Sequence, residues 1–276
     1  MPLSRRQFVS TLPTLGALTV ATAELHAQQQ QPAAGGWPAP PPTPAWRDES
    51  FPSQHAHLAR EIVGVAHRDL ARVKELVSAH PSLAKASWDW GFGDWETALG
   101  SASHVGNRPI AEFLIENGAP PTIFSAAMLG QLDVVKAYAA AIPDIHLLRG
   151  PHGIPLAAHA RAGGAQAEPV LQFLTTLGAP APAVPVVPLS DADRTSIEGR
   201  YTFGPGPRDA FTVKSQGNLW GIQRDGGELR GLTHVGDLQF HPVGAHAVRV
   251  KFDRSPSGTS LSLLDPDLVV TAKKVG

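Results

Sequence analysis

Two proline-rich segments set the limits of what this chain can fold into. Seven of the 26 prolines stand between Pro32 and Pro52, and a second group stands between Pro180 and Pro188. Such segments favour an extended, polyproline-like backbone and bury no core. We therefore expect two folded blocks separated by linkers. The predicted division is a leader at 1–27, linkers at 28–52 and 181–190, and folded blocks at 53–180 and 191–276.

Composition excludes several classes of function. The 276 residues include no cysteine, and the formal net charge is −1. The lack of cysteine rules out disulfide scaffolds, thiolate metal sites and a cysteine nucleophile. A nearly neutral chain has no overall field that attracts nucleic acid, so we expect no nucleic-acid partner.

The N-terminus contains a pair of arginines followed by an apolar stretch. The run SRRQF from Ser4, followed by an apolar residue, resembles the twin-arginine export signal. Residues 7–23 are too short and too polar for a membrane span, so they are interpreted as the apolar part of that signal. Cleavage after Ala23 and cleavage after Ala27 both fit. The resemblance implies export in a folded state to the periplasm or the cell exterior, with no membrane span in the mature chain.

Short apolar helical segments recur in the first block. Ile62, Leu99, Ile123 and Leu156 stand in one register, at intervals of 37, 24 and 33 residues. A small residue stands four positions after each of them, at Ala66, Ser103, Ala127 and Ala160. Apolar stripes at i, i+3 and i+4 then predict a second helix in every unit. The pattern therefore indicates about four helix pairs.

Two short motifs in this block resemble the ankyrin repeat. TAL at 97–99 and IPL at 154–156 stand where that family has T-P-L, and Gly-Ala pairs at 118–119 and 178–179 stand where its repeat closes. The resemblance covers 54–179 and implies an ankyrin-like α-solenoid of about four units, whose concave side binds proteins. An unrelated helical bundle is the alternative for the same stripes.

The resemblance also implies which residues face the groove. The last turn of each first helix points there, five and six residues after the register position. The candidate partner-binding residues are His67, Arg68, His104, Met128 and Arg161. Solvent exposure of ordinary helix ends is the alternative interpretation.

Aromatic residues gather between the first two units. Trp88, Trp90, Phe92 and Trp95 lie within eight positions, around glycines that permit a tight turn. Tryptophan is favoured at binding hot spots, so we include these four residues among the candidate partner-binding residues. The alternative is that the rings pack on the neighbouring helices or on the C-terminal block.

The second block has the pattern of an all-β domain. Short β-prone runs alternate with turn signals, which predicts a small antiparallel β-barrel or meander. The expected strands are 200–203, 210–215, 219–224, 228–233, 238–241, 247–253, 260–264 and 268–273. The predicted fold class is therefore a multidomain α + β protein, with an ankyrin-like solenoid followed by this barrel.

Several short motifs of the second block resemble the small β-domain appended to bacterial serine beta-lactamase-related hydrolases. They are IEGRY at 197–201, GNL at 217–219, LQFHP at 238–242 and VRVKF at 248–252. In those hydrolases the domain is an accessory and not the catalytic unit. A barrel of this size either holds a small apolar ligand or is filled by its own side chains.

Residues with catalytic or metal-binding chemistry are scattered along the sequence. Ser82 and Lys85 match S-x-x-K, but no K-T-G or S-D-N follows. His55 and His57 are the only closely spaced histidine pair, whereas a metal site needs three or four convergent ligands. We therefore expect no metal, no cofactor and no enzymatic activity.

The leading hypothesis is an exported ankyrin-repeat scaffold that binds a protein partner in the cell envelope. One rival is an envelope protein whose β-barrel binds a small ligand. A second rival is a serine hydrolase-related accessory protein that uses Ser82 and Lys85.

Overall fold

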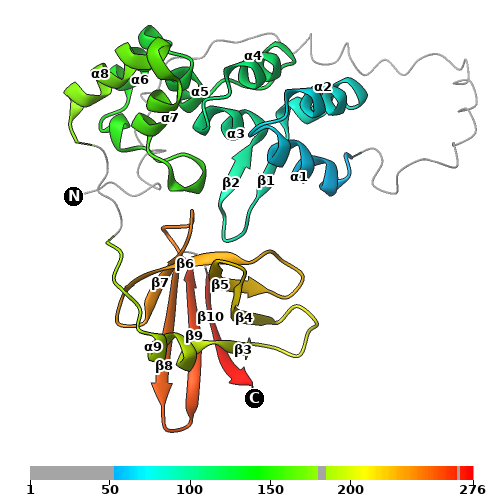
Figure 1. Ribbon diagram of the computed structural model, residues 1–276, viewed down its shortest axis with the longest axis vertical. Coiled ribbons are helices and arrows are strands. Elements are labelled where there is room, and N and C mark those ends of the chain that lie inside the picture. Colours follow the sequence, from blue (N-terminus) through cyan, green and yellow to red (C-terminus); the bar gives the residue numbers. More distant parts are fainter. Residues whose placement is uncertain (1–52, 180–184, 266–267, 276) are drawn as a thin grey trace, which may run out of the picture. The chain divides into compact units, whose positions relative to one another are not determined.

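The computed structural model describes residues 53–179, 185–265 and 268–275 (Figure 1). The predicted leader at 1–27, the linker at 28–52 and part of the linker at 181–190 lie outside the described residues. Helices α1 to α8 precede residue 180, and the strands of the barrel follow residue 190. Among the residues that the structure describes, no helix combines the length and the apolar character that crossing a membrane requires.

The helical part is built from short helices and one β-hairpin. The helices are α1 (Ala56–Val65), α2 (Leu70–Ala79), α3 (Ala98–His104), α4 (Arg108–Glu116), α5 (Ile123–Met128), α6 (Leu132–Ala141), α7 (Leu156–Ala162) and α8 (Glu168–Leu177). The hairpin pairs β1 (Ser87–Asp89) with β2 (Trp95–Thr97). Short 3-10 segments are η2 (Pro81–Lys85), η3 (Ile145–Leu147), η4 (Pro151–Gly153) and η5 (Gly164–Ala167).

Side-chain caps fix where several of these helices begin. Asp69 accepts a hydrogen bond from Arg72 N, and Thr97 accepts one from Gly100 N. Thr122 and Ser125 form a reciprocal capping box at the start of α5. Each cap satisfies a backbone N–H that the first turn of a helix leaves without a partner. The threonine of the TAL motif therefore sets the start of α3, and with it the position of His104 at the end of that helix.

The predicted ankyrin-like α-solenoid is wrong. In a solenoid each repeat contacts only its neighbours. Here α3 contacts α1, α5 and also α7, two units further along. Helix α5 has fewer than two turns, which allows α3 to reach past it.

The buried side chains also differ from those of one continuous stack. They form two clusters, one centred on α1 to α4 and the other on α5 to α8. Ionisable side chains from the turn after α1, the hairpin, α3 and η4 gather at a place where an exposed groove was expected.

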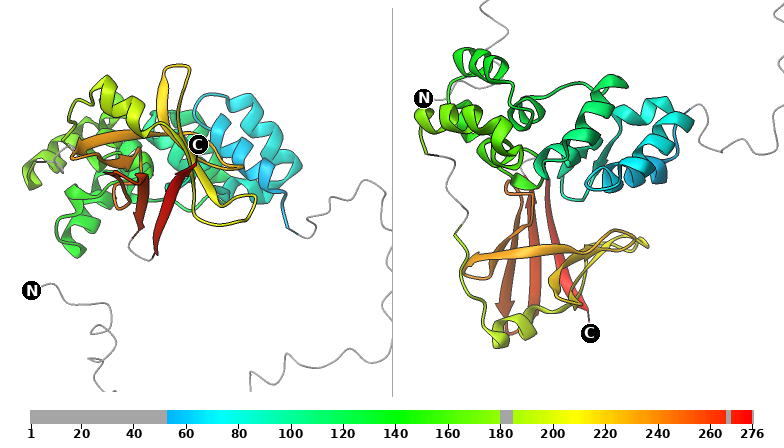
Figure 2. Two further views of the ribbon diagram at one scale, coloured as in Figure 1. Left: turned by 90° about the horizontal axis from the view of Figure 1, so that it is seen from below. Right: turned by 45° about the horizontal axis from the view of Figure 1, so that its top comes forward.

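The predicted antiparallel β-barrel is confirmed. Within the described residues, eight strands close in the order β10-β3-β4-β5-β6-β7-β8-β9. Strands β8, β9 and β10 lie side by side in both sets of views (Figures 1 and 2). Helix α9 (Asp191–Ile197) precedes the barrel, whose strands are β3 (Gly199–Thr202), β4 (Ala210–Gln216), β5 (Leu219–Arg224), β6 (Arg230–Gly236), β7 (Gln239–Pro242), β8 (Arg249–Ser255), β9 (Gly258–Asp265) and β10 (Leu268–Val275).

Large side chains fill the centre of the barrel. Phe240 is fully buried, and its ring centroid lies 5.5 Å from that of Trp220 and 5.6 Å from that of Phe252. The buried Tyr201 hydroxyl donates a hydrogen bond to Ile197 O over 2.7 Å, so its polar end is satisfied. A ligand deep inside the barrel would have to displace these rings.

Candidate metal centre

Four segments of the helical part converge on one point. His67 follows α1, Glu96 lies in β2, His104 ends α3, and His152 lies in η4. The hairpin carries Glu96 to this point because β1 contacts α1 and β2 contacts α3 (Figure 1). One nitrogen from each histidine and one carboxylate oxygen all lie within 4.8 Å of one another.

Four of the six separations among these atoms are close to those around a tetrahedral ion. His104 Nε2 lies 2.9 Å from Glu96 Oε1 and 3.1 Å from His67 Nε2. The same Glu96 oxygen lies 3.3 Å from His152 Nε2 and 3.7 Å from His67 Nε2. Four N or O ligands, each 2.0–2.1 Å from a tetrahedral zinc ion, stand about 3.3 Å apart. The cluster is therefore close to a coordination shell in its dimensions.

Two of the histidines have their outer nitrogen held by an acceptor. His67 Nδ1 donates to Gly64 O over 2.9 Å, and His152 Nδ1 donates to Asp94 Oδ2 over 2.7 Å. Neither acceptor can donate, so the hydrogen bond fixes the proton on Nδ1. In the neutral ring, Nε2 then presents its lone pair to the cluster. This arrangement is the usual support of a metal-binding histidine.

Glu96 is held as a carboxylate at the bottom of the cluster. Its side chain is fully buried, and its outer oxygen Oε2 accepts a hydrogen bond from Trp90 Nε1 over 2.7 Å. Burial alone would raise the pKa of Glu96, but hydrogen bonds from His104, His152 and Trp90 outweigh it and lower the pKa to about 2. The inner oxygen therefore carries negative charge at neutral pH.

Asp94 positions His152 from behind. Its carboxylate accepts the hydrogen bond from His152 Nδ1 and a second one from the backbone His152 N over 2.8 Å. It also forms an ion pair with Arg230. His152 has a φ of 58°, which non-glycine residues rarely adopt, so the two bonds to Asp94 hold a strained turn in place. Hydrogen bonds to Asp94 and then Glu96 raise the pKa of His152 to about 9.

His159 lines the cluster without joining it. It is fully buried, and its Nδ1 lies 2.9 Å from Ser103 Oγ. Burial, followed by the charge of His104, lowers the pKa of His159 to about 4. A neutral imidazole therefore forms the wall behind His104, whose ring centroid lies 6.3 Å away.

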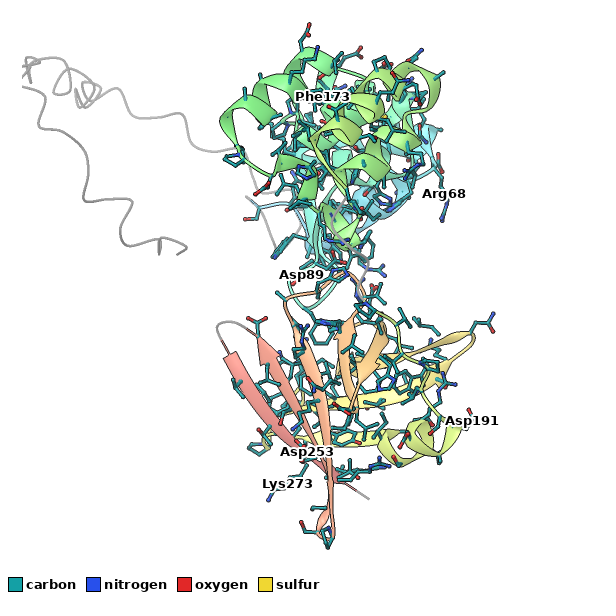
Figure 3. The ribbon with its side chains drawn as sticks, turned by 90° about the vertical axis from the view of Figure 1, so that its left-hand side faces the viewer. Arg68, Asp89, Phe173, Asp191, Asp253 and Lys273 are labelled. Carbon is teal, nitrogen blue, oxygen red and sulfur yellow. The ribbon has the colours of Figure 1, made fainter. Side chains whose placement is uncertain are left out.

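The predicted partner-binding residues at the helix ends lie in different environments. His67 and His104 do lie together, but in this cluster. Met128 is fully buried in the core, so its prediction as a partner-binding residue is wrong. Arg68 and Arg161 are exposed, and Figure 3 shows the side chain of Arg68 extending from the surface. A role for these two arginines in binding a protein stays a prediction.

Of the four aromatic residues of the hairpin, three are packed against a core and one is exposed. Trp88 and Trp90 pack on the helical core, and Phe92 packs on the core of the barrel. Trp88, Trp90 and Phe92 therefore fit the alternative, in which the rings pack on the neighbouring helices or on the C-terminal block. Trp95 is 61% exposed, and its role in binding a partner stays a prediction.

The motifs considered for chemistry lie elsewhere. Ser82 and Lys85 both lie in η2 and are exposed, and among the described residues no hydrogen bond joins them. His55 and His57 are exposed at the start of α1 and do not belong to the cluster.

No sequence motif identified Glu96, His152 or the supporting Asp94 as members of a convergent set of ligands. One local signal was available. Asp94 and Glu96 are two positions apart in an extended segment, which places both carboxylates on one face of the hairpin.

Comparison with known proteins returns no match. No protein-family model matches the sequence, and neither a curated protein nor a solved structure matches it. The resemblance of the second block to the accessory β-domain of hydrolases therefore stays a prediction.

Proposed function

We propose that this protein binds one divalent transition-metal ion, with zinc as the preferred ion, through His67, Glu96, His104 and His152. The observation that carries the proposal is the convergence of four ligand atoms within 4.8 Å of one another, together with the hydrogen bonds that direct two histidine nitrogens inward. Three imidazoles and a carboxylate suit zinc, and tetrahedral geometry favours zinc over ions that prefer octahedral oxygen sites.

The ligand set favours holding the ion over using it for hydrolysis. Catalytic zinc sites keep a position for water beside three protein ligands, whereas structural sites have four. Here four side chains meet, and they come from four separate segments of the chain. A bound ion would therefore cross-link the turn after α1, the hairpin, the end of α3 and η4.

One side of the cluster is within reach of solvent. The side chains of His67 and His152 are each 24% exposed, whereas that of Glu96 is fully buried. An ion can thus enter past the two histidines and come to rest against the carboxylate. We propose that loading precedes export, because the predicted twin-arginine signal implies transport of a folded chain.

Metal titration of the purified chain tests this proposal. The protein is stripped with a chelator, and Zn²⁺ or Co²⁺ is added while native mass spectrometry counts bound ions and the visible spectrum of Co²⁺ reports its geometry. We expect one ion per chain, an intense tetrahedral Co²⁺ spectrum, and a higher melting temperature. At a thousandfold excess of free ion over Kd, the gain in unfolding free energy is about 4 kcal/mol.

Variants locate the ion. Glu96→Gln and His67→Ala should each abolish stoichiometric binding, because the first removes the negative charge of the carboxylate ligand and the second removes a ligand nitrogen of the cluster. The matched control is the double variant His55→Ala/His57→Ala, which removes the exposed histidine pair near the start of α1. If the control loses the ion, or if Glu96→Gln keeps it, the proposal is wrong.

A further inference from the structure

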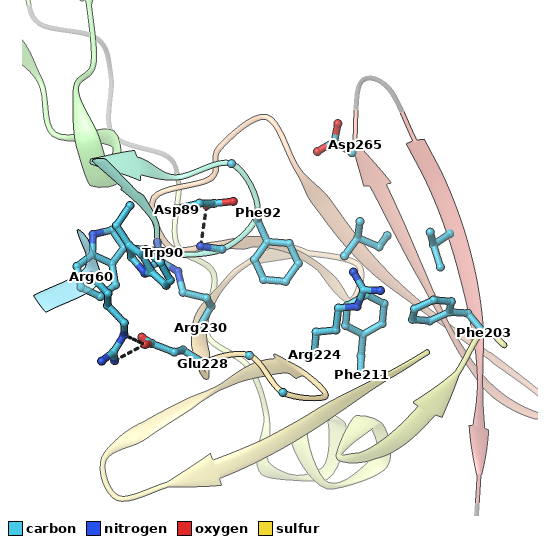
Figure 4. Close-up of a pocket in the computed structure, with 17 residues that line it drawn as sticks. Arg60, Asp89, Trp90, Phe92, Phe203, Phe211, Arg224, Glu228, Arg230 and Asp265 are labelled. Carbon is cyan, nitrogen blue, oxygen red and sulfur yellow. Dashed lines mark hydrogen bonds and ion pairs between the residues drawn. The ribbon is translucent and has the colours of Figure 1, made fainter. Parts of the chain in front are cut away.

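A cavity of about 680 Å³ opens where the tip of the β1–β2 hairpin meets the strands of the barrel (Figure 4). Its apolar lining comes from Trp90 and Phe92 on one side and from Phe203, Phe211, Leu263 and Val270 on the other. Cavities that hold small molecules commonly measure 300–1,000 Å³ and are mostly apolar. Its floor continues into the core of the barrel, because Phe211 and Leu263 belong to that core.

Phe92 enters this cavity at a conformational cost. It stands between Gly91 and Gly93, and all three have positive φ, 60° for Phe92 itself. A bulky side chain rarely adopts that conformation, and such strained residues cluster at ligand-binding positions. Figure 4 shows the Phe92 ring directed into the cavity. Glycine would relieve the strain but would leave the apolar wall incomplete.

The three arginines of the lining differ in their partners. Arg60 is paired with Glu228, and Arg230 is paired with Asp94. Arg224 donates from Nε to Arg208 O over 3.0 Å, and its guanidinium lies 5.7 Å from the Phe203 ring centroid. Among the described residues, no carboxylate forms an ion pair with Arg224. Its outer N–H groups therefore remain available to a ligand at the cavity wall.

Arg230 also lines the cavity, but its charge is already paired with Asp94. The Nε–H of Arg230, another lining residue, is buried and has no acceptor among the described residues. Because this atom is closed off from solvent, a ligand in the cavity cannot reach it, and Arg230 forms part of the wall without offering a free donor. The lining also contains Asp89, Glu228 and Asp265, which match its three arginines in number, so the cavity has no excess of positive charge to hold a multiply charged anion such as a phosphate.

From these features we infer that the cavity binds a small molecule with a flat apolar body and a single carboxylate. The body lies between Phe92 and the Phe203–Phe211 pair, whose ring centroids are 5.2 Å apart. The carboxylate accepts hydrogen bonds from the fork of Arg224, the geometry in which arginine recognises carboxylates. This site is separate from the metal ligands and goes beyond the proposed metal binding.

Calorimetric titration of the full chain with three matched probes tests the inference. The probes are naphthoate, naphthalenemethanol and naphthylmethylamine, which share one flat body and differ in charge. We expect naphthoate to bind at least tenfold more tightly than the alcohol, and the amine to bind most weakly. No binding of any probe, or equal binding of acid and alcohol, would overturn the inference.

Two variants separate the contributions. Arg224→Gln should reduce naphthoate affinity to that of the alcohol and leave alcohol binding unchanged, whereas Arg254→Gln, an exposed arginine on β8 paired with Asp193, should change neither. Phe92→Gly should weaken acid and alcohol alike while circular dichroism shows a retained fold. Full acid preference in Arg224→Gln, or unchanged binding in folded Phe92→Gly, contradicts the proposed site.

Discussion

Asp94 touches none of the ligand nitrogens that face the cluster, yet we expect it to control metal affinity. Its carboxylate accepts two hydrogen bonds from His152, one from Nδ1 and one from the backbone N. The first fixes the tautomer and makes Nε2 more basic, and the second holds the strained turn. Asp94→Asn keeps the size of the side chain and removes the negative charge.

The expected loss follows from that geometry. Replacing a carboxylate behind a metal-binding histidine costs 10- to 100-fold in affinity, or about 1.4–2.8 kcal/mol. The assay is competition for Zn²⁺ against a chromophoric chelator, with circular dichroism to confirm the fold. Asp89→Asn is the matched control, because Asp89 lies in the same hairpin and accepts its hydrogen bond from Gly91 N.

Arg230 needs its own control. Without the charge of Asp94, its buried guanidinium loses its ion-pair partner, and this alone can destabilise the chain. The double variant Asp94→Asn/Arg230→Gln removes both charges and should recover stability but not zinc affinity. An Asp94→Asn protein that folds and binds zinc within twofold of the parent refutes the reasoning.

Four further predictions concern protons and packing. Because the pKa of metal-free His152 is about 9, Zn²⁺ at pH 7.5 should release about one proton per ion, detected by calorimetry in buffers of different ionisation heat. By the same linkage, His152 stabilises the metal-free fold fully below pH 6.5, and urea titrations should show that contribution disappearing as pH rises through about 9; a flat profile contradicts this. Phe240→Ala should lower the unfolding free energy by about 3–5 kcal/mol in urea, since the ring is fully buried, and a loss under about 1 kcal/mol would contradict the packed barrel. Gly106→Ala should destabilise more than Gly164→Ala, because both have positive φ but only at Gly106 does an added Cβ collide with Ala162 O; equal melting temperatures would contradict that contact.

The barrel was predictable because its signals are local. Val248, Val250 and Phe252 alternate with polar residues, and all three are buried in the structure. Turn residues such as Gly217 and Gly226 mark the ends of neighbouring strands. Pairing of each strand with the next along the chain then needs only short connections, which the sequence spacing already contains.

The assembly of the helices was not predictable in the same way. The apolar stripes placed the individual helices well, since Val73, Leu76 and Val77 are all buried as the stripe predicts. The contact of α3 with α7 joins segments that are far apart in sequence, and no periodicity within either helix encodes it. Periodicity states which face of a helix is apolar, but it does not state which other helix covers that face.

Only two of the four residues of the candidate metal centre could be grouped from the sequence, for a related reason. The shared register correctly placed His67 and His104 at equivalent helix ends, and their Nε2 atoms lie 3.1 Å apart. His152 lies in a turn with positive φ, 48 residues after His104. Glu96 lies on a hairpin that the repeat pattern contains only as extra residues between two units. Such convergence depends on tertiary packing, which the sequence spacing alone does not contain.

X-ray absorption spectroscopy of the zinc-loaded chain tests the central claim most directly. We expect four nitrogen or oxygen ligands at about 2.0–2.1 Å, with the multiple scattering of three imidazoles, and the loss of this spectrum in Glu96→Gln. A six-coordinate shell of water oxygens, or an imidazole signal that persists when His67 and His152 are both replaced by alanine, would contradict it.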